Sequence, residues 1–340
     1  MQAFVLKAYG GPESTGLTQV LLPEPAPRQL LVRVRAAGLN PVDFKTRRGD
    51  LRLVQRYRLP VVLGNELAGE VVACGDQVQR FRVGDRVFAR VAKSSMGAFA
   101  QFAVVEDDHA AVMPASLDFA TAAAIPLAGL TALQALRDEL RVTNGQRIFI
   151  SGGAGGVGTF AIQIAKQLGA LVATTASPQG EALVRQLGAD TVVDYTKESP
   201  DKVLSGFDGA LDLVGGHALE QAFAMVRPGA TVVSVAGMPE PQTASKDLGR
   251  GMGLQALFWA ASFPLRRRAR QHGVRYRYLF MHPSGEDLSE LGRLVDAGAL
   301  RVIVDSVHPF GRIAEAMSRL EAGHAKGKIV VTMPDDSNLA

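Results

Sequence analysis

The segment Gly153–Gly158 restricts the fold of this 340-residue chain more than any other part of its sequence. It reads Gly-Ala-Gly-Gly-Val-Gly, follows the strand-like run Arg147–Ser151 directly, and opens the helix-like stretch Thr159–Leu168. Glycines spaced as GxGxxG between a strand and a helix allow a tight turn and a close approach of the backbone to a pyrophosphate, which the free N–H groups of the helix then bind. We therefore predict a dinucleotide-binding turn whose candidate contacts are Gly153, Gly155, Gly156, Val157 and Gly158.

The sequence around this turn alternates between short apolar runs and stretches of helix length. The runs read RIFISGG, LVATTAS, TVVDYT, GALDLVGG, ATVVSVAG and RYRYLFM. Alternation of this kind is typical of a parallel sheet with right-handed crossovers. It predicts an α/β fold, with a doubly wound nucleotide-binding domain over residues 119–282.

The rest of the chain shows a different pattern of expected strands and helices. Up to Asp118 it consists of short β-rich segments separated by Gly, Pro and Asp turns, and no long helical pattern competes with them. After residue 282, a helix-like stretch, a strand, a second helix and the terminal strand KIVVTM follow. Because such a remnant cannot bury itself, we expect it to pack on the first part, so that residues 1–118 and 283–340 form one β-rich domain.

Composition excludes several classes of protein. Hydrophobic residues form 47% of the chain and charged residues 21%, as in ordinary soluble proteins. A net charge of +4 is modest for this length, so no nucleic-acid partner is expected. The first residues lack a signal-peptide pattern, and the longest apolar stretch, Leu254–Leu265, is too short to span a bilayer. The single cysteine, Cys74, excludes an intramolecular disulfide and favours the reducing cytoplasm.

The segment after the second apolar run bears on the choice of cofactor. NAD-selective sites carry an Asp or Glu about 20 residues beyond the glycine motif. This chain has Thr174-Thr175-Ala176-Ser177 there. Without a carboxylate, nothing repels a 2′-phosphate, so we predict NADPH as the cofactor. The candidate phosphate contacts are Ser177, Arg185, Tyr195 and Lys197, although Arg185 and Lys197 are equally consistent with ordinary solvated charges. Thr175 is a further candidate contact of the cofactor.

Four further segments match a known family. They are GLNPVDFKTRRG, which contains Asn40 and Asp43, VLGNELAGEVV, AAAIPLAGLTALQAL and GHAKGKIVV. Over nearly its whole length the chain thereby resembles the medium-chain dehydrogenase/reductase superfamily, in its zinc-free quinone oxidoreductase (zeta-crystallin-like) and enone reductase branch. The resemblance implies a GroES-like substrate domain formed from both ends of the chain, a Rossmann domain between them, an active site in the interdomain cleft, and a homodimer joined through the strand near residues 275–281.

The same resemblance bears on metal binding. In the zinc-dependent members, a Cys at the position of Asn40 and a His at the position of Asn65 hold the catalytic zinc, and four cysteines hold a structural one. An amide is a poor zinc ligand beside a thiolate or an imidazole, and this chain lacks the cysteines. We therefore predict no zinc. Without that Lewis acid, alcohol oxidation is disfavoured.

A zinc-free site can still pass hydride to an acceptor that is already electrophilic, such as a quinone or an α,β-unsaturated carbonyl. From the matched motifs we expect Asn40 near the nicotinamide and the acceptor. Asp43 either frames the site or anchors its own loop. Tyr57 is a candidate proton donor, because Leu51 stands where enoyl thioester reductases carry a tyrosine; a packing role for Tyr57 and protonation by solvent are the alternatives. The other candidates at the cofactor are Thr131, Val214, Ser234, Ala236, Gly237, Lys326 and Lys328.

Other functions remain open at this point. An enoyl-CoA or enoyl thioester reductase would use the same fold, and a non-catalytic, crystallin-like or RNA-binding NADPH protein would keep the cofactor motif. The arginine cluster at residues 266–277, preceded by Phe258, Trp259 and Phe263, has three interpretations. It forms a wall for a large or phosphorylated acceptor, a contact with an anionic membrane, or a packed helix with a solvated basic end near the dimer interface.

Overall fold

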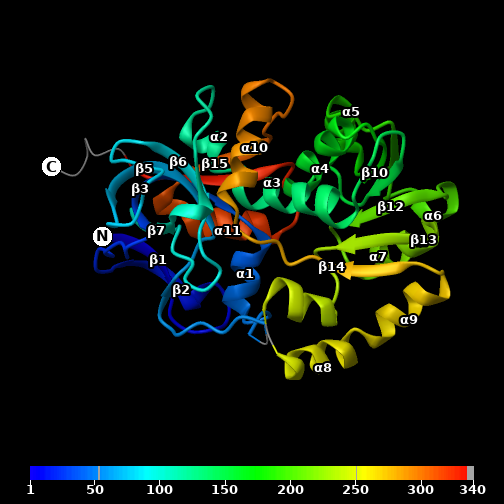
Figure 1. Ribbon diagram of the computed structural model, residues 1–340, viewed down its shortest axis with the longest axis horizontal. Coiled ribbons are helices and arrows are strands. Elements are labelled where there is room, and N and C mark those ends of the chain that lie inside the picture. Colours follow the sequence, from blue (N-terminus) through cyan, green and yellow to red (C-terminus); the bar gives the residue numbers. More distant parts are fainter. Residues whose placement is uncertain (53, 250, 335–340) are drawn as a thin grey trace. The chain divides into compact units, whose positions relative to one another are not determined.

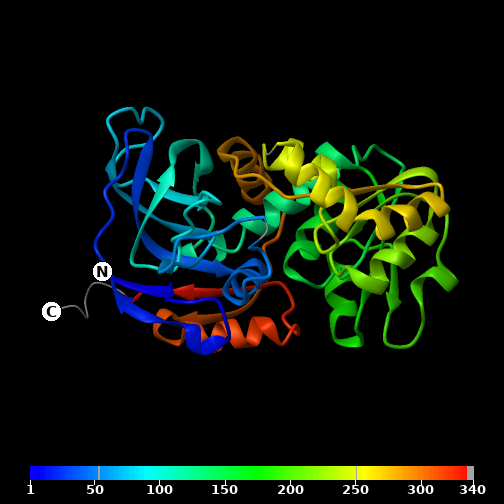
Figure 2. The same cartoon turned by 90° about the horizontal axis from the view of Figure 1, so that it is seen from below.

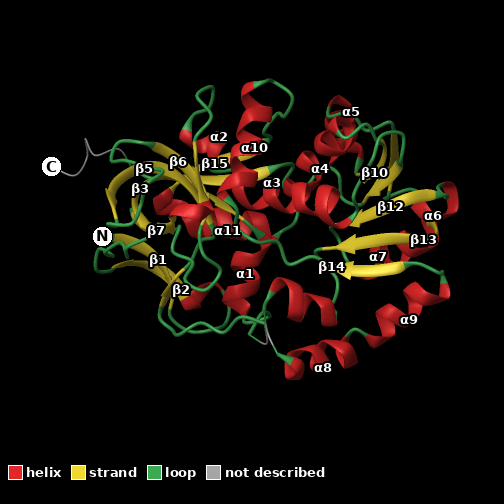
Figure 3. Cartoon of the chain, viewed as in Figure 1, coloured by secondary structure: helices red, strands yellow, loops and turns green. Residues whose placement is uncertain are grey.

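The computed structural model describes residues 1–52, 54–249 and 251–334, and the chain divides into two compact units (Figure 1). Unit 1 contains Met1–Leu130 together with Pro283–Gly298 and the residues from Val302 onward. Unit 2 contains Thr131–His282 and Ala299–Arg301. Each unit has its own sheets and its own helices, as the colouring by secondary structure in Figure 3 shows.

Unit 1 is built mainly from antiparallel strands. In the described residues they form one sheet of order β2-β1-β4 and another of order β15-β16-β3-β5-β6-β8, with β7 also paired to β3. The strands are β1 (Gln2–Leu6), β2 (Thr15–Gln19), β3 (Gln29–Leu39), β4 (Val61–Val62), β5 (Glu66–Cys74), β6 (Arg86–Arg90), β7 (Phe102–Glu106), β8 (Ala110–Val112), β15 (Val304–Pro309) and β16 (Lys328–Thr332).

The C-terminal strand completes the larger sheet of unit 1. Strand β16 pairs antiparallel with β3, so that Ile329 lies opposite Leu39. Figure 2 shows this red segment beside the blue N-terminal strands. The apolar side chains of both strands enter one core cluster, which explains why a strand from the end of the chain is needed to bury the first strands.

The helices of unit 1 are short. They are α1 (Pro41–Arg48), α2 (Phe119–Ala122), α10 (Gly285–Asp296) and α11 (Ile313–Glu321), while α3 (Pro126–Leu133) crosses into unit 2. The sequence pattern did not predict α1, because eight residues are too few to show a helical period. It begins after Asn40 with proline in its first turn and ends at Gly49, whose φ of 84° is the left-handed conformation common at helix ends.

The boundary between the units falls at Leu130 and not near the predicted residue 118. Helix α2 packs on β3 and β5, and the backbone N–H of Leu127 donates to Glu66 Oε2 at 2.6 Å. These contacts hold the stretch before Leu130 to unit 1, although its alanine-rich, helix-like sequence resembles the helical segments of unit 2.

Unit 2 is a doubly wound α/β unit, as predicted. Its described strands form a parallel sheet of order β11-β10-β9-β12-β13-β14. They are β9 (Arg147–Ile150), β10 (Leu171–Ala176), β11 (Thr191–Asp194), β12 (Phe207–Asp212), β13 (Val226–Ser234) and β14 (Arg275–Tyr278). The chain moves from β9 outward to β10 and β11, then returns to β12 on the other side. The loops after β9 and β12 therefore diverge at the carboxyl ends of the strands, where such sheets bind nucleotides.

Helices follow the strands of unit 2 as crossovers. They are α4 (Gly156–Gln167), α5 (Pro178–Gln186), α6 (Pro200–Val203), α7 (Gly216–Met225), α8 (Met252–Ala261) and α9 (Phe263–Gln271), with π-helical segments at Gln134–Glu139 and Thr243–Asp247. Phe149, Phe207 and Phe223 belong to a buried core cluster in this unit. No helix in the described parts of the chain is long and apolar enough to cross a membrane.

Candidate active site

The glycine turn after β9 is fixed by the neighbouring strand β10. The backbone N–H of Gly153 donates to the Thr175 carbonyl at 3.0 Å, and that of Gly152 donates to Thr175 Oγ1 at 2.9 Å. Thr175, a predicted contact of the cofactor, is buried, and its side chain holds this turn. Helix α4 begins within the glycine motif, at Gly156, with Gly155 as its N-cap.

The three spaced glycines are needed for different reasons. A Cβ on Gly153 would lie 2.2 Å from Thr174 Oγ1, and one on Gly158 would lie 2.4 Å from the Gly152 carbonyl oxygen. Packing inside the protein therefore requires these two. A Cβ on Gly155 would meet only the Gly152 oxygen, at an ordinary 3.4 Å, and its φ of −76° suits any residue. The described residues therefore do not require glycine at position 155, where the second glycine of such a motif leaves room for a pyrophosphate.

Asp212, at the end of β12, ties together the carboxyl ends of the central strands. Its carboxylate accepts hydrogen bonds from Ser151 Oγ at 2.9 Å and from Ser234 Oγ at 2.7 Å, and from the backbone N–H of Gly215. Asp212 is fully buried and was not among the predicted residues. An acid that ends an apolar run, as in GALDLVGG, is the signal that could have identified it.

The predicted residues after β12 and β13 lie around this carboxylate. The Ser234 hydroxyl accepts from the backbone N–H groups of Ala236 at 3.1 Å and of Gly237 at 2.9 Å, so it shapes the turn that follows β13. Val214 exposes its side chain, whereas Thr131, in α3, is buried. The topology therefore brings Val214, Ser234, Ala236 and Gly237 to the same edge of the sheet as the glycine turn.

Of the predicted polar residues after β10 and β11, Ser177 and Tyr195 lie close to the ends of the strands, whereas Arg185 lies farther along α5. Ser177 is the N-cap of α5 and is half-buried, and its side chain makes no capping hydrogen bond. Arg185 lies in the last turn of the same helix and pairs with Glu181 at 2.8 Å, so the structure does not bring it to Ser177. Tyr195 is exposed directly after β11. Asp194, at the end of β11, binds Lys197 at 3.2 Å, which offsets its charge.

In unit 1, the predicted residues Asn40 and Asp43 lie in a buried polar cluster. The Asp43 carboxylate accepts from the Asn40 backbone N–H at 2.7 Å and from Asn65 Nδ2 at 2.6 Å. Asn40 Nδ2 donates to Glu66 Oε1 at 2.6 Å. All four residues are buried. The side-chain amide of Asn40 is therefore engaged inside unit 1.

Lys328 supplies the cation of this cluster. Its ammonium group donates to Glu66 Oε1 at 2.6 Å, to Asn40 Oδ1 at 2.5 Å and to the Leu39 carbonyl at 2.8 Å. Both Lys328 and Glu66 are buried, so each charge depends on the other. Lys328 was among the predicted residues, and Glu66 was not. Lys326 is half-buried, and its backbone N–H donates to Asp305.

Burial controls the ionisation of two predicted residues. Desolvation raises the pKa of Asp43 to about 7, although the hydrogen bond from Asn65 lowers it. Burial likewise raises the pKa of Tyr57 to about 12, and its hydroxyl donates to the Lys93 carbonyl at 2.8 Å. Tyr57 also packs against the core of unit 1. A phenol held in this way is poorly placed to release a proton, which agrees with the packing alternative.

Asp43 should make stability depend on pH. Its pKa is about 7 in the folded chain against an ordinary 3.8, so the folded state holds this proton more tightly than the unfolded state. The stabilisation is complete below the ordinary value and is lost as the pH rises toward 7. We expect the free energy of unfolding to fall by about 3 kcal/mol more in the wild type than in Asp43→Asn between about pH 5 and pH 8. Urea denaturation of both proteins measures this, and equal changes would contradict it.

The residues of this cluster do not fit a zinc ion. Asn40 and Asn65 offer amides where zinc takes thiolate, imidazole or carboxylate ligands, and both amides are already hydrogen-bonded. The Lys328 ammonium group lies against Asn40 and would repel a cation. Within the described residues, no cluster of three or more His, Cys, Asp and Glu side chains is placed to hold a metal ion.

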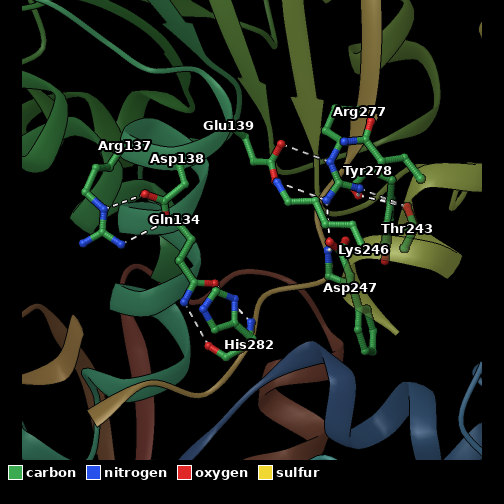
Figure 4. A network of polar contacts seen from close by, with 12 residues as sticks. Gln134, Arg137, Asp138, Glu139, Thr243, Lys246, Asp247, Arg277, Tyr278 and His282 are labelled. Atoms are coloured by element: carbon green, nitrogen blue, oxygen red, sulfur yellow. Dashed lines mark hydrogen bonds and ion pairs between the residues drawn. The ribbon is translucent and has the colours of Figure 1, made fainter. Parts of the chain in front are cut away.

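Figure 4 shows a second charged network, which lies in unit 2 around Arg277. This guanidinium group binds Glu139 at 3.1 Å, Glu240 at 3.1 Å and Asp247 at 2.5 Å. Lys246 binds Glu139 as well, at 2.6 Å. The solvated interpretation of the arginine cluster is therefore wrong for Arg277, which is buried. Its charge is offset by carboxylates, and it anchors the π-helical segment Thr243–Asp247 to β14.

Comparisons with known proteins agree with this architecture. Residues 26–115 match the family model "Alcohol dehydrogenase GroES-like domain", and residues 187–331 match "Zinc-binding dehydrogenase". The chain is 37% identical to the mitochondrial NAD(P)H oxidoreductase RTN4IP1 of Danio rerio, over 99% of the chain and 92% of that protein. It is 34% identical to the chloroplastic NADPH-dependent alkenal/one oxidoreductase of Arabidopsis thaliana, over 97% of the chain and 79% of that protein.

A solved structure gives the same result. The quinone oxidoreductase from Coxiella burnetii aligns with a TM-score of 0.85 at 31% identity, over 98% of this chain and 99% of that one. The glycine turn, the β-rich unit built from both ends of the chain and these relatives all point to one assignment. The chain is an oxidoreductase that belongs to the medium-chain dehydrogenase/reductase superfamily, in its quinone oxidoreductase branch.

Proposed function

We propose that this protein is an NADPH-dependent, metal-independent reductase that transfers hydride to a quinone or an α,β-unsaturated carbonyl compound. The observation that carries the proposal is the carboxyl edge of the sheet in unit 2. There the glycine turn, the free N-cap of α5 and the Asp212-centred turns lie together, and β10 ends without a carboxylate. Two relatives named for NAD(P)H or NADPH support the same cofactor.

The residues of unit 2 would divide the work of holding NADPH. The backbone at Gly155 and the N-terminus of α4 receive the pyrophosphate. Ser177 and the N-terminus of α5 receive the 2′-phosphate, while Lys197 neutralises the nearby acid at the end of β11. The turn shaped by Ser234 positions the nicotinamide end. NADPH, when bound, supplies the hydride for the acceptor.

Unit 1 supports a chemistry without a metal. The two positions that hold zinc in other members of the superfamily are linked to the Glu66–Lys328 ion pair and to Asp43. We propose that this cluster fixes the loop around Asn40 and that solvent supplies the proton, because the Tyr57 hydroxyl is engaged with a backbone carbonyl. An acceptor that is already polarised needs no Lewis acid.

Consumption of NADPH in the presence of a chelator tests this function. The panel contains a benzoquinone, a phenanthrenequinone, an alkyl vinyl ketone, an alkenal and crotonyl-CoA, with NADH in parallel. Chelator-insensitive turnover that prefers NADPH supports the proposal, and the best acceptor distinguishes a quinone from an enone. Preference for crotonyl-CoA would instead support an enoyl thioester reductase. Tight NADPH binding without turnover of any acceptor would support a non-catalytic protein.

Ser177 offers a test of cofactor choice. Replacing Ser177 by Ala removes a hydroxyl that no capping bond occupies, so the Kd for NADPH should rise by about three- to tenfold while that for NADH is unchanged. Titration of the cofactor by intrinsic or nucleotide fluorescence measures both constants. Ser199→Ala is the control for loss of a hydroxyl at another helix start, that of α6, where Ser199 donates to Asp201 and accepts from Gln221. Equal losses for both nucleotides would contradict a role at the 2′-phosphate.

We also propose a homodimer formed through β14. This strand is the last in the order of the sheet in unit 2, so its outer backbone groups are available to a second copy within the described structure. Pairing of two such edges would extend the sheet across a two-fold axis. Sedimentation velocity measures the expected doubling of mass.

A further inference from the structure

Helices α8 and α9 follow each other in unit 2, where α9 packs against β14 (Figure 1), and their side chains form an unusual surface. Helix α8 reads MGLQALFWAA and carries no charge. Met252 is 85% exposed, Trp259 55% and Phe263, at the start of α9, 43%. Large apolar side chains gathered on one exposed element mark a site that something covers, since a stable soluble surface scatters them.

The two helices present this surface as one continuous face. The rings of Trp259 and Phe263 lie 5.9 Å apart across the junction, and the Arg266 guanidinium lies 5.5 Å above the Trp259 ring. Within each helix, exposed positions follow each other at steps of three or four, which places them along one side of that helix. They are Met252, Ala256, Trp259, Phe263, Arg267 and Arg270. We call this set the α8–α9 face.

The opposite side of the same helices is anchored. Phe258, Ser262 and Ala269 are buried, and the Ser262 hydroxyl donates to the Phe258 carbonyl at 2.5 Å. Ala269 belongs to the core cluster of unit 2. The buried side therefore holds the helices in place, and the α8–α9 face remains exposed in the folded chain.

Charge identifies what would cover this face. Residues 248–285 contain seven arginines and no acidic residue. Arg268 is neutralised by Glu220, from α7, and Arg277 by the buried network, whereas Arg267 and Arg270 are exposed at the basic end of the face. The face thus combines an uncharged aromatic half with a cationic half. The partner of this face must therefore have an apolar region next to negatively charged groups.

We propose that the α8–α9 face docks on the surface of an anionic lipid bilayer. Trp259 and Phe263 would enter the boundary between headgroups and acyl chains, where aromatic rings are most stable, and Arg267 and Arg270 would bind lipid phosphates. A second copy of the chain fits less well. In a symmetric pair the same face meets itself, and this face has no acidic residue to receive the arginines.

The protein contains a built-in reporter for this contact, because Trp259 is its only tryptophan. Full-length protein is mixed with vesicles of phosphatidylcholine, with or without about 30% phosphatidylglycerol, at low and high salt. We expect the emission of Trp259 to shift to the blue, and the protein to sediment with the vesicles, only when phosphatidylglycerol is present and salt is low. No emission shift and no co-sedimentation with anionic vesicles would overturn the proposal.

Charge variants locate the contact. Arg267→Glu/Arg270→Glu should lower the partition coefficient onto anionic vesicles by about 30-fold or more, while Arg267→Lys/Arg270→Lys should retain it. Arg56→Glu/Arg58→Glu makes the same change of charge at two exposed arginines of unit 1 and should leave binding unchanged. NADPH binding and circular dichroism confirm that each variant is folded.

Two further outcomes would assign the face differently. Equal vesicle binding by the Arg267→Glu/Arg270→Glu variant would place the lipid contact elsewhere and overturn the proposal. A blue shift of Trp259 that grows with protein concentration in the absence of vesicles would assign the face to a second copy, and would overturn it as well. Because the readouts are binding and emission, they do not depend on which acceptor the enzyme reduces.

Discussion

Alanine in place of Gly155 is expected to raise the Kd for NADPH by about tenfold or more while it leaves thermal stability nearly unchanged. The reason is that Gly155 has an ordinary extended backbone and that an added Cβ would meet only the Gly152 oxygen, at 3.4 Å. The protein itself tolerates this methyl group. A pyrophosphate that approaches the backbone at this point would collide with the methyl group. Isothermal titration with NADPH and a thermal melt without the cofactor measure the two effects separately.

Gly158→Ala is the matched control for this experiment. Its Cβ would lie 2.4 Å from the Gly152 oxygen and 2.7 Å from Gly153 Cα, both backbone atoms that cannot move aside cheaply. This variant should therefore lose stability as well as cofactor affinity, by about 1–3 kcal/mol for an overpacked site. If Gly155→Ala bound NADPH as tightly as the wild type, the turn would not be the pyrophosphate site. If it melted as early as Gly158→Ala, the assignment of free space in front of Gly155 would be wrong.

The second large effect is expected at Lys328. Replacing Lys328 by Met leaves the Glu66 carboxylate buried without the ammonium group that pairs with it, although Asn40 and the Leu127 N–H still donate to it. Removal of one member of a buried ion pair costs about 3–5 kcal/mol. Lys326→Met, only two positions away and half-buried, should cost little. Urea denaturation, in which the unfolding transition of unit 1 is monitored, measures the difference in free energy of unfolding between the two variants.

A double variant tests whether charge is the cause. Lys328→Met/Glu66→Gln removes both charges and keeps a hydrogen-bonding group beside Asn40. It should therefore recover much of the stability that Lys328→Met loses. Additive losses in the double variant would instead indicate that Lys328 acts through packing alone. NADPH binding to unit 2 should persist in all these proteins, because the glycine turn does not contain either residue.

Local patterns were sufficient to predict unit 2. The run RIFIS and the GxGxxG motif are contiguous, so the strand, the turn and helix α4 all follow from one stretch of sequence. The alternation of runs also predicted the parallel sheet, whose order reverses at β9. Cofactor candidates at strand ends were identified because every parallel strand carries its carboxyl end to the same edge.

Contacts between distant parts of the chain could not be predicted in this way. Asp212 reads as one acid after a strand, and only the folded sheet places it between Ser151 and Ser234. Arg277 reads as part of a solvated basic run until Glu139, which is 138 positions away, binds it. Thr175 reads as one hydroxyl at a strand end, and only the fold shows that it accepts a hydrogen bond from the Gly152 backbone N–H. In each case a buried polar group found a partner that sequence spacing does not reveal.

The pairing of β16 with β3 has a consequence for the order in which the chain is made. Unit 2 is almost contiguous, so a ribosome completes it before β16 exists. Until then, Ala36–Leu39 of β3 have no partner on the side that β16 later covers. Asn40 also lacks its hydrogen bond from the Lys328 ammonium group, which lies 288 positions later in the chain. A product of premature termination would therefore carry a complete glycine turn together with an open strand edge, which is a template for aggregation.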